Sequence, residues 1–218
     1  GFELVVMDHP QSDVADQALH MIGQIYSLYF DQYDRALSAY QRLVQGYPRS
    51  PYAPSAQLAR AEIYHYKYED YAHALIEYHR LLSLFPDFPQ PDRIHYRMAR
   101  CFLELRSFTQ YRAELQAILD QYPDSTWTDD AALSLAESYY LEGQTEMALT
   151  QYQEFLRDYP QSPLGIQARF GVAKSLEESL RLEEAIQAYK ELLKDYPNKS
   201  LIQDRLAAVE KRFQERNR

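Results

Sequence analysis

The sequence contains few of the residues that cross-link small folds or allow tight turns. Its 218 residues include one Cys and six Gly, and no apolar run approaches the ~20 residues needed to span a bilayer. A single Cys excludes a disulfide framework and the cysteine-rich zinc modules. The scarcity of Gly and the lack of long alternating apolar and polar stretches favour helices over strands.

Basic residues are also in the minority. The chain carries 23 Lys and Arg against 32 Asp and Glu, which gives a net charge of −9. Proteins that neutralise phosphate backbones need clustered Lys and Arg, so this balance argues against nucleic acid as the main partner. What the sequence has in abundance is Tyr, with 20 residues, and most of them recur at a fixed period.

An aromatic residue followed by Pro recurs every 37 or 38 residues. The five pairs are Tyr47-Pro48, Phe85-Pro86, Tyr122-Pro123, Tyr159-Pro160 and Tyr196-Pro197, and His9-Pro10 stands one period upstream. A small residue lies 12 positions before the Pro in four of the five copies, and aromatic or aliphatic residues lie eight and five before it. These offsets share one face of an α-helix, which the Pro then ends.

A second helix precedes each of these helices, and a small residue marks its middle. The five small residues are Gly23, Ala61, Ala99, Ala136 and Ala173. Such residues let neighbouring helices approach closely. A Ser two positions after the Pro is expected to cap the next helix, at Ser12, Ser50, Ser125 and Ser162. Each unit is therefore a helical hairpin, and hairpins of this kind must stack to bury their apolar faces.

These residues resemble the tetratricopeptide repeat (TPR) family. The unit with the closest match carries the TPR pattern at Leu135, Ala136, Tyr139, Gly143, Ala148, Tyr152 and Pro160. TPR units have 34 residues, whereas these have 37 or 38. The phrase YPxSxxAxxA, at residues 47–56, is similar to that of the bacterial cell-envelope TPR group, the BamD- and YbgF-like proteins. The resemblance implies a periplasmic or outer-membrane-associated scaffold for envelope assembly or maintenance.

We expect an all-α fold, a right-handed TPR superhelix (α-solenoid) of about five hairpins closed by a capping helix. The predicted parts of this one continuous domain are the second half of a truncated repeat at 1–10, repeats at 11–48, 49–86, 87–123, 124–160 and 161–197, and the capping helix at 198–218. In the capping helix an apolar stripe is predicted at Leu201, Leu206, Val209 and Phe213. The chain itself has no transmembrane segment, so we expect any membrane association to depend on an anchor in a missing N-terminal region.

No catalytic or metal-binding pattern stands out in the sequence. The six His form no His-Xaa-Xaa-Xaa-His pair, and neither a phosphate-binding glycine loop nor a nucleophile elbow is present. Cys101 adjoins Phe102 in the middle of a predicted helix, where a free Cys is usually a small buried hydrophobe. We therefore expect a chain that is not an enzyme, with no catalytic residue, no metal and no cofactor.

In TPR arrays the first helix of each hairpin lines the concave surface, and its register predicts which residues meet a partner. Nine residues are the candidate contacts: Glu62, His65, Tyr66, Arg93, Tyr96, Arg97, Arg100, Glu137 and Tyr140. Three arginines on one face of a helix are the least expected feature of a chain at −9. Arginine binds carboxylates bidentately and stacks on aromatic rings, which suits a protein interface.

The sequence also supports competing interpretations. In a structural account, Arg93, Arg97 and Arg100 pair with Glu62, Glu104 and Glu137 and only hold adjacent helices together. The leading function is a non-catalytic scaffold whose concave groove binds a peptide or helix of another protein. The alternatives are a self-assembling structural protein, which forms a homodimer through the exposed N-terminal half-repeat, and an accessory subunit of an enzyme complex.

Overall fold

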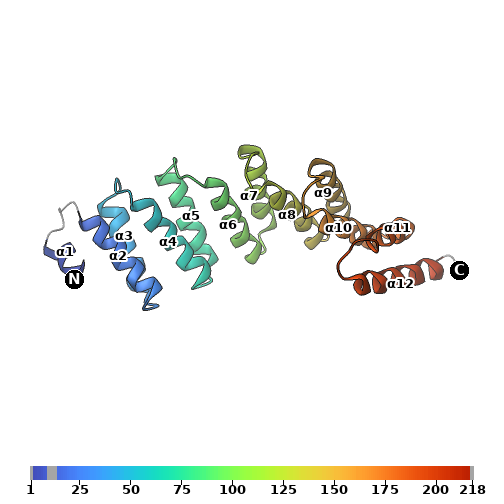
Figure 1. Ribbon diagram of the computed structural model, residues 1–218, viewed down its shortest axis with the longest axis horizontal. Helices are drawn as coiled ribbons and strands as arrows, with labels where there is room; N and C mark the ends of the chain where they lie inside the picture. Colours follow the sequence, from blue (N-terminus) through green and yellow to red (C-terminus); the bar gives the residue numbers. More distant parts are fainter. Residues whose placement is uncertain (1, 9–13, 217–218) are drawn as a thin grey trace. The chain divides into compact units, whose positions relative to one another are not determined.

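The computed structural model describes residues 2–8 and 14–216, and the regular structure in this part of the chain is entirely helical. The helices are α1 (Phe2–Asp8), α2 (Ala15–Leu28), α3 (Tyr33–Gly46), α4 (Ala53–Tyr66), α5 (Tyr71–Leu84), α6 (Pro91–Glu104), α7 (Phe108–Gln121), α8 (Thr128–Leu141), α9 (Thr145–Asp158), α10 (Gly165–Glu178), α11 (Leu182–Leu192) and α12 (Lys199–Arg216) (Figure 1). The all-α prediction is confirmed. His9, Pro10 and Ser12, which the repeat pattern includes, lie outside the described residues.

The helices form two compact units, Gly1–Ser107 and Phe108–Arg218. In the first unit the consecutive helices from α1 to α6 pack against one another, and in the second unit the consecutive helices from α7 to α12 do the same. The boundary falls between α6 and α7, within the predicted third repeat at 87–123. The repeat boundaries remain a prediction.

The second helix of each hairpin buries the face that the sequence pattern predicts. The residues 12, eight and five positions before each Pro are all at most 4% exposed: Ala36, Tyr40, Leu43, Ala74, Tyr78, Leu81, Tyr111, Leu115, Ile118, Ala148, Tyr152, Phe155, Ala185, Tyr189 and Leu192. The aromatic residue next to the Pro is half-buried in all five copies. Burying one Tyr or Leu contributes about 1.5–3 kcal/mol, so this repeated face is the main source of stability in both units.

The small residues of the first helices lie in the core, and Gly23 accepts an aromatic ring there. A Cβ atom on Gly23 of α2 would lie 2.3 Å from the ring of Tyr40 on α3. In the second unit a similar contact joins two successive hairpins, because a Cβ on Gly171 of α10, two residues before the recurring Ala173, would lie 2.3 Å from the ring of Tyr152 on α9. In both cases the absent methyl group makes room for a buried Tyr.

One residue with a positive φ angle lies in the turn after the first helix of each described hairpin. These residues are Asp31 (φ 50°), Glu69 (φ 52°), Arg106 (φ 53°), Gly143 (φ 78°) and Leu180 (φ 59°), and they recur at the same 37- or 38-residue period. Only Gly143 is free of the steric cost that a Cβ brings in this region. The turn geometry is thus a property of the repeat, and three copies adopt it with a residue that does not favour it, namely Glu69, Arg106 and Leu180.

The serines after the prolines lie two positions before the N-cap residue. The Ser50 hydroxyl accepts a hydrogen bond from the Tyr52 backbone N–H at 3.1 Å, and Ser162 does the same for Leu164. Tyr52 and Leu164 are themselves the residues that precede the helices, so the hydroxyl closes a turn before the helix begins. The predicted role as N-cap is therefore wrong by two residues.

The C-terminal helix α12 covers the end of the second unit. Ile202 and Val209 are fully buried, and Leu206 and Phe213 pack against the same cluster. The predicted stripe named Leu201 in place of Ile202, but Leu201 is 37% exposed. Spacings of four, three and four residues from Ile202 keep one helical face toward α11, which a stripe starting at Leu201 does not.

Candidate protein-binding groove

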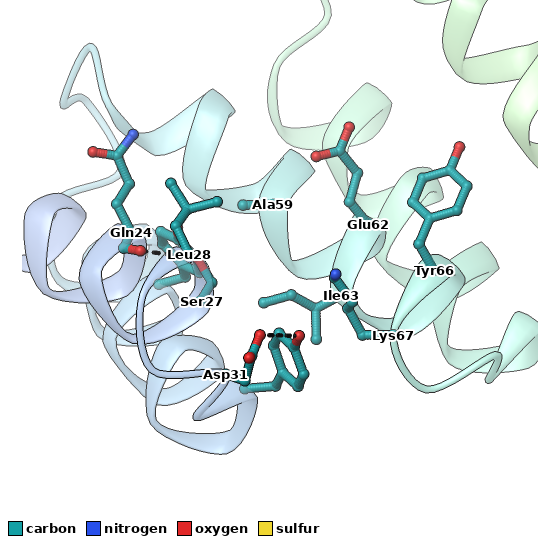
Figure 2. Close-up of a pocket in the computed structure, with 11 residues that line it drawn as sticks. Gln24, Ser27, Leu28, Asp31, Ala59, Glu62, Ile63, Tyr66 and Lys67 are labelled. Atoms are coloured by element: carbon teal, nitrogen blue, oxygen red, sulfur yellow. Dashed lines mark hydrogen bonds between the residues drawn. The ribbon is translucent and has the colours of Figure 1, made fainter.

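A groove of about 390 Å³ opens between α2 and α4, the first helices of two successive hairpins in the first unit (Figure 2). The residues that line it are Gln24, Ser27, Leu28, Asp31, Tyr33, Tyr40, Ala59, Glu62, Ile63, Tyr66 and Lys67. Two of them, Glu62 and Tyr66, were predicted as partner contacts from the register of helix A. The size lies within the range typical of pockets that receive a side chain or a small ligand.

The walls of the groove are apolar and accessible. Leu28 is 70% exposed and Tyr66 is 54% exposed, while Ile63 between them is buried. Figure 2 shows the side chains of Gln24, Glu62 and Tyr66 extending to the same side, above Ala59. Exposed apolar side chains around a buried floor, with polar groups at the rim, are the usual composition of a protein-binding surface.

Short-range bonds hold the rim in place. Asp31 accepts a hydrogen bond from the Tyr33 hydroxyl at 2.6 Å, and the Ser27 hydroxyl donates to the carbonyl of Gln24 at 3.2 Å. Lys67 Nζ lies 5.6 Å from the centre of the Tyr33 ring. These contacts occupy the turn that follows α2, so the turn residue with positive φ also shapes the groove.

The arginines of α6 differ in their surroundings. Arg97 is mostly buried and forms an ion pair with Glu62 at 2.6 Å. Arg93 is exposed and reaches only the side-chain oxygen of Gln90, at 3.3 Å. Arg100 is exposed and makes no ion pair with any residue that the structure describes. The structural account therefore applies to Arg97, whereas Arg93 and Arg100 keep their guanidinium groups available.

Two further predicted contacts, His65 and Tyr96, are set back from the surface. Tyr96 is half-buried on α6. His65 is 8% exposed, its Nδ1 lies 3.0 Å from the Tyr78 hydroxyl, and its ring stacks on Tyr66 with centres 4.0 Å apart. The stacked His65 ring therefore supports the exposed Tyr66 ring.

His65 is uncharged at neutral pH. Burial, followed by the nearby charges of Arg97 and Arg100, lowers its pKa to about 4. The Cys101 Sγ lies 3.6 Å from the same ring nitrogen, and burial raises the pKa of this thiol to about 12. A thiol with such a pKa is not a nucleophile at pH 7, so Cys101 belongs to the core, as predicted.

The remaining predicted contacts, Glu137 and Tyr140, belong to α8 of the second unit. Glu137 is exposed, and Tyr140 is half-buried with Lys174 Nζ 4.0 Å from its ring centre. Burial raises the pKa of Tyr140. Lys174 also lies 5.6 Å from the centre of the Phe170 ring, so this cation is shared between two aromatic residues of the second unit.

Sequence reasoning missed Leu28, the most exposed wall of the groove. Tyr66 was selected because it lies five positions after the small residue Ala61, and Leu28 lies five positions after Gly23. Applying the same offset to the first hairpin would have found it. Lys67 and Asp31 come from the turns after the helices, where a helical register carries no information.

Within residues 2–8 and 14–216, no group of three His, Cys, Asp or Glu side chains is arranged to hold a metal ion. Among the described helices, none combines the length and the apolar character that a membrane crossing requires.

The stacked hairpins and the groove define a TPR-type protein–protein interaction scaffold, a class that binds protein or peptide partners. Residues 17–50 match a tetratricopeptide repeat family. Residues 95–212, more than half of the chain, match the outer membrane lipoprotein family YfiO, and the chain belongs to that family. The matched residues lie outside the groove, so the family relationship and the groove are separate observations.

Solved TPR structures share the fold at low sequence identity. MamA is 18% identical, with a TM-score of 0.62 over 84% of this chain and 92% of its own. YrrB, described as a TPR protein with an unusual peptide-binding site, is 15% identical, with a TM-score of 0.63 over 94% of this chain and 96% of its own. PilW, a type IV pilus biogenesis factor, is 16% identical, with a TM-score of 0.58 over 94% and 87%. No curated protein sequence matches the chain. The TPR prediction is confirmed.

Proposed function

We propose that the chain is a non-catalytic scaffold of the bacterial cell envelope, and that the groove between α2 and α4 binds a peptide or helix of another protein. The observation that carries the proposal is the pair of exposed walls, Leu28 and Tyr66, over a buried floor. Side chains of this kind lose contact with water when a partner covers them, which is the main driving force of association.

Membership of an outer membrane lipoprotein family supports the envelope setting, in outer-membrane assembly or maintenance. The fold shared with a pilus biogenesis factor is consistent with a periplasmic or outer-membrane-associated location. The nine predicted contacts enter the proposal in three roles. Glu62 and Tyr66 line the groove, with His65 stacked on Tyr66; the α6 residues flank it; and Glu137 and Tyr140 form a separate surface on the second unit.

The test is affinity capture from the native host after cross-linking, with the full-length protein. The groove variant carries Leu28→Ser and Tyr66→Ser. The control variant carries Ile76→Ser and Leu84→Ser on α5, which are 46% and 55% exposed and do not line the groove. We expect partners to be lost from the groove variant only. Equal partner lists for both variants would contradict the proposal, provided that circular dichroism shows both to be folded.

Self-association is the second candidate, because α1 presents apolar side chains to solvent. Phe2 is 44% exposed, Leu4 58% and Met7 72%. They adjoin Ile25 and Phe30 in a second apolar pocket of the first unit. The test is the mass in solution across a concentration series, with and without residues 1–10. A dimer that disappears on deletion would support self-association, and a monomer in both cases would contradict it.

A further inference from the structure

The groove is flanked by positive charge that its own unit does not neutralise. Arg93 and Arg100 are both exposed on α6, and neither has a carboxylate partner among the described residues. Arg97 lies between them in the sequence and is bound by Glu62, which also lines the groove. The contact between Arg97 and Glu62 thus holds α6 beside the groove. Arg93 and Arg100, before and after Arg97 on the same helix, keep free guanidinium groups.

Of the two free arginines, Arg100 lies near the exposed wall. The charges of Arg97 and Arg100 are close enough to His65 to lower its pKa, and the His65 ring stacks on Tyr66. Because Arg93 and Arg100 are seven residues apart on one helix, they share a face and their Cα atoms are separated by two turns, about 10 Å.

Arg42 and Arg49 of the first unit are also exposed without a carboxylate partner among the described residues, so what distinguishes Arg93 and Arg100 is their place on α6, beside the ion pair of Arg97 with Glu62. The second unit shows the alternative, because Arg169, Arg181 and Arg212 each bind a carboxylate within 3.0 Å. Guanidinium groups aligned along one face form favourable contacts with carboxylates of a partner and disfavour basic partners.

We propose that the groove of the first unit recognises an acidic amphipathic helix. An apolar side chain of that helix enters between Leu28 and Tyr66, and two carboxylates seven residues apart pair with Arg93 and Arg100. The inference rests on the proposed function, and it adds the chemistry of the partner. The carboxylates of Glu62 and Asp31 line the groove and repel a uniformly negative ligand. The groove therefore favours a helix with carboxylates at defined positions over a polyanion.

The test is selection from a display library of 16-residue helical peptides, randomised on one face, against the immobilised full chain. We expect enrichment of peptides with two Asp or Glu seven positions apart around an apolar residue. Selection against the Arg93→Gln, Arg100→Gln variant should lose this acidic pair and keep the apolar residue. A control variant with Arg42→Gln and Arg49→Gln has the same net charge, alters exposed arginines outside the groove, and should retain the acidic pair.

Binding measured by fluorescence anisotropy then gives the size of the effect. Replacing both carboxylates of a selected peptide by amides should weaken binding about threefold to tenfold, as expected for two solvent-exposed ion pairs. The loss should shrink as salt is added. Selected peptides without acidic residues, or an equal effect of the Arg42 and Arg49 control, would overturn the inference while the groove remains a binding site. Peptides that bind equally well to the Leu28→Ser, Tyr66→Ser variant, or no enrichment at all, would overturn the proposed function as well.

Discussion

The two units use the same position of the hairpin in opposite ways. The residue four positions after the small residue of the first helix contacts the hydroxyl of the buried Tyr on the second helix. In the first unit this residue is His65, with Nδ1 3.0 Å from the Tyr78 hydroxyl. In the second unit it is Glu177, which accepts a hydrogen bond from the Tyr189 hydroxyl at 2.8 Å.

The two residues differ in charge and in the groups that they contact. Glu177 is buried and draws in Arg212 at 3.0 Å and Arg205 at 3.8 Å, both from the terminal helix α12. His65 is neutral at pH 7 and instead stacks on the exposed Tyr66. The same position of the hairpin thus holds a buried carboxylate that binds two arginines in the second unit, and a neutral imidazole that stacks on an exposed ring in the first.

The largest effect should come from removing the buried carboxylate of the second unit. Glu177→Leu leaves the buried Tyr189 hydroxyl without its acceptor and frees two arginines of α12. We expect a loss of about 3 kcal/mol in the free energy of unfolding, measured by urea denaturation. The double variant with Tyr189→Phe should recover part of this loss, because no buried hydroxyl is then unpaired. Additive losses in the cycle would show that the two side chains do not interact.

The packing of small residues against Tyr rings predicts a contrast within a single helix. Gly171→Ala on α10 forces a methyl group against Tyr152 and should cost about 1–3 kcal/mol. Gly165→Ala on the same helix meets open space and should be neutral or stabilising by up to about 1 kcal/mol. Thermal unfolding of the two variants checks the prediction, and equal melting temperatures would contradict it.

The His65 site predicts a pH dependence that is confined to the first unit. Its pKa of about 4 lies below the unfolded value of 6.5, so the unfolded chain binds the extra proton and stability falls as pH drops through this range. Between pH 7 and pH 5 the loss should be about 2 kcal/mol. Hydrogen exchange of α4 and α5 measures it. In His65→Gln the loss should largely disappear, and an unchanged pH profile would contradict the assignment.

The smallest effects should come from the turns with positive φ. Leu180→Gly relieves the steric cost of a Cβ in the left-handed region and should stabilise the second unit by up to about 1 kcal/mol. Gly143→Ala introduces that cost and should destabilise the same unit by about 1 kcal/mol. Chemical denaturation of both variants provides the comparison, and effects of the same sign would contradict the role assigned to φ.

The periodic part of the structure could be predicted from the sequence, because burial repeats with the helical period. Ala36, Tyr40 and Leu43 were predicted on one face, and all three are buried. In α12 this reasoning reaches its limit, because Ile202 is buried where Leu201 was predicted. Near a chain end several apolar residues compete for one face, and contact with α11 decides between them.

The site was less predictable because its residues are distinguished by their partners. Arg93, Arg97 and Arg100 are equivalent in sequence spacing, yet among the residues that the structure describes only Arg97 meets a carboxylate. His65 was predicted as a contact, although burial and the bond to Tyr78 make it a support for Tyr66. The turn residues of the groove, Asp31 and Lys67, lie outside any helical register.

The most direct test places a photo-crosslinking amino acid at equivalent positions of the two units. Tyr66 and Leu141 both lie five positions after the small residue of their helix, and they are 54% and 60% exposed. If the open groove of the first unit is the working surface, substitution at Tyr66 captures a discrete partner in living cells and substitution at Leu141 does not. Capture at Leu141 with none at Tyr66 would contradict the account.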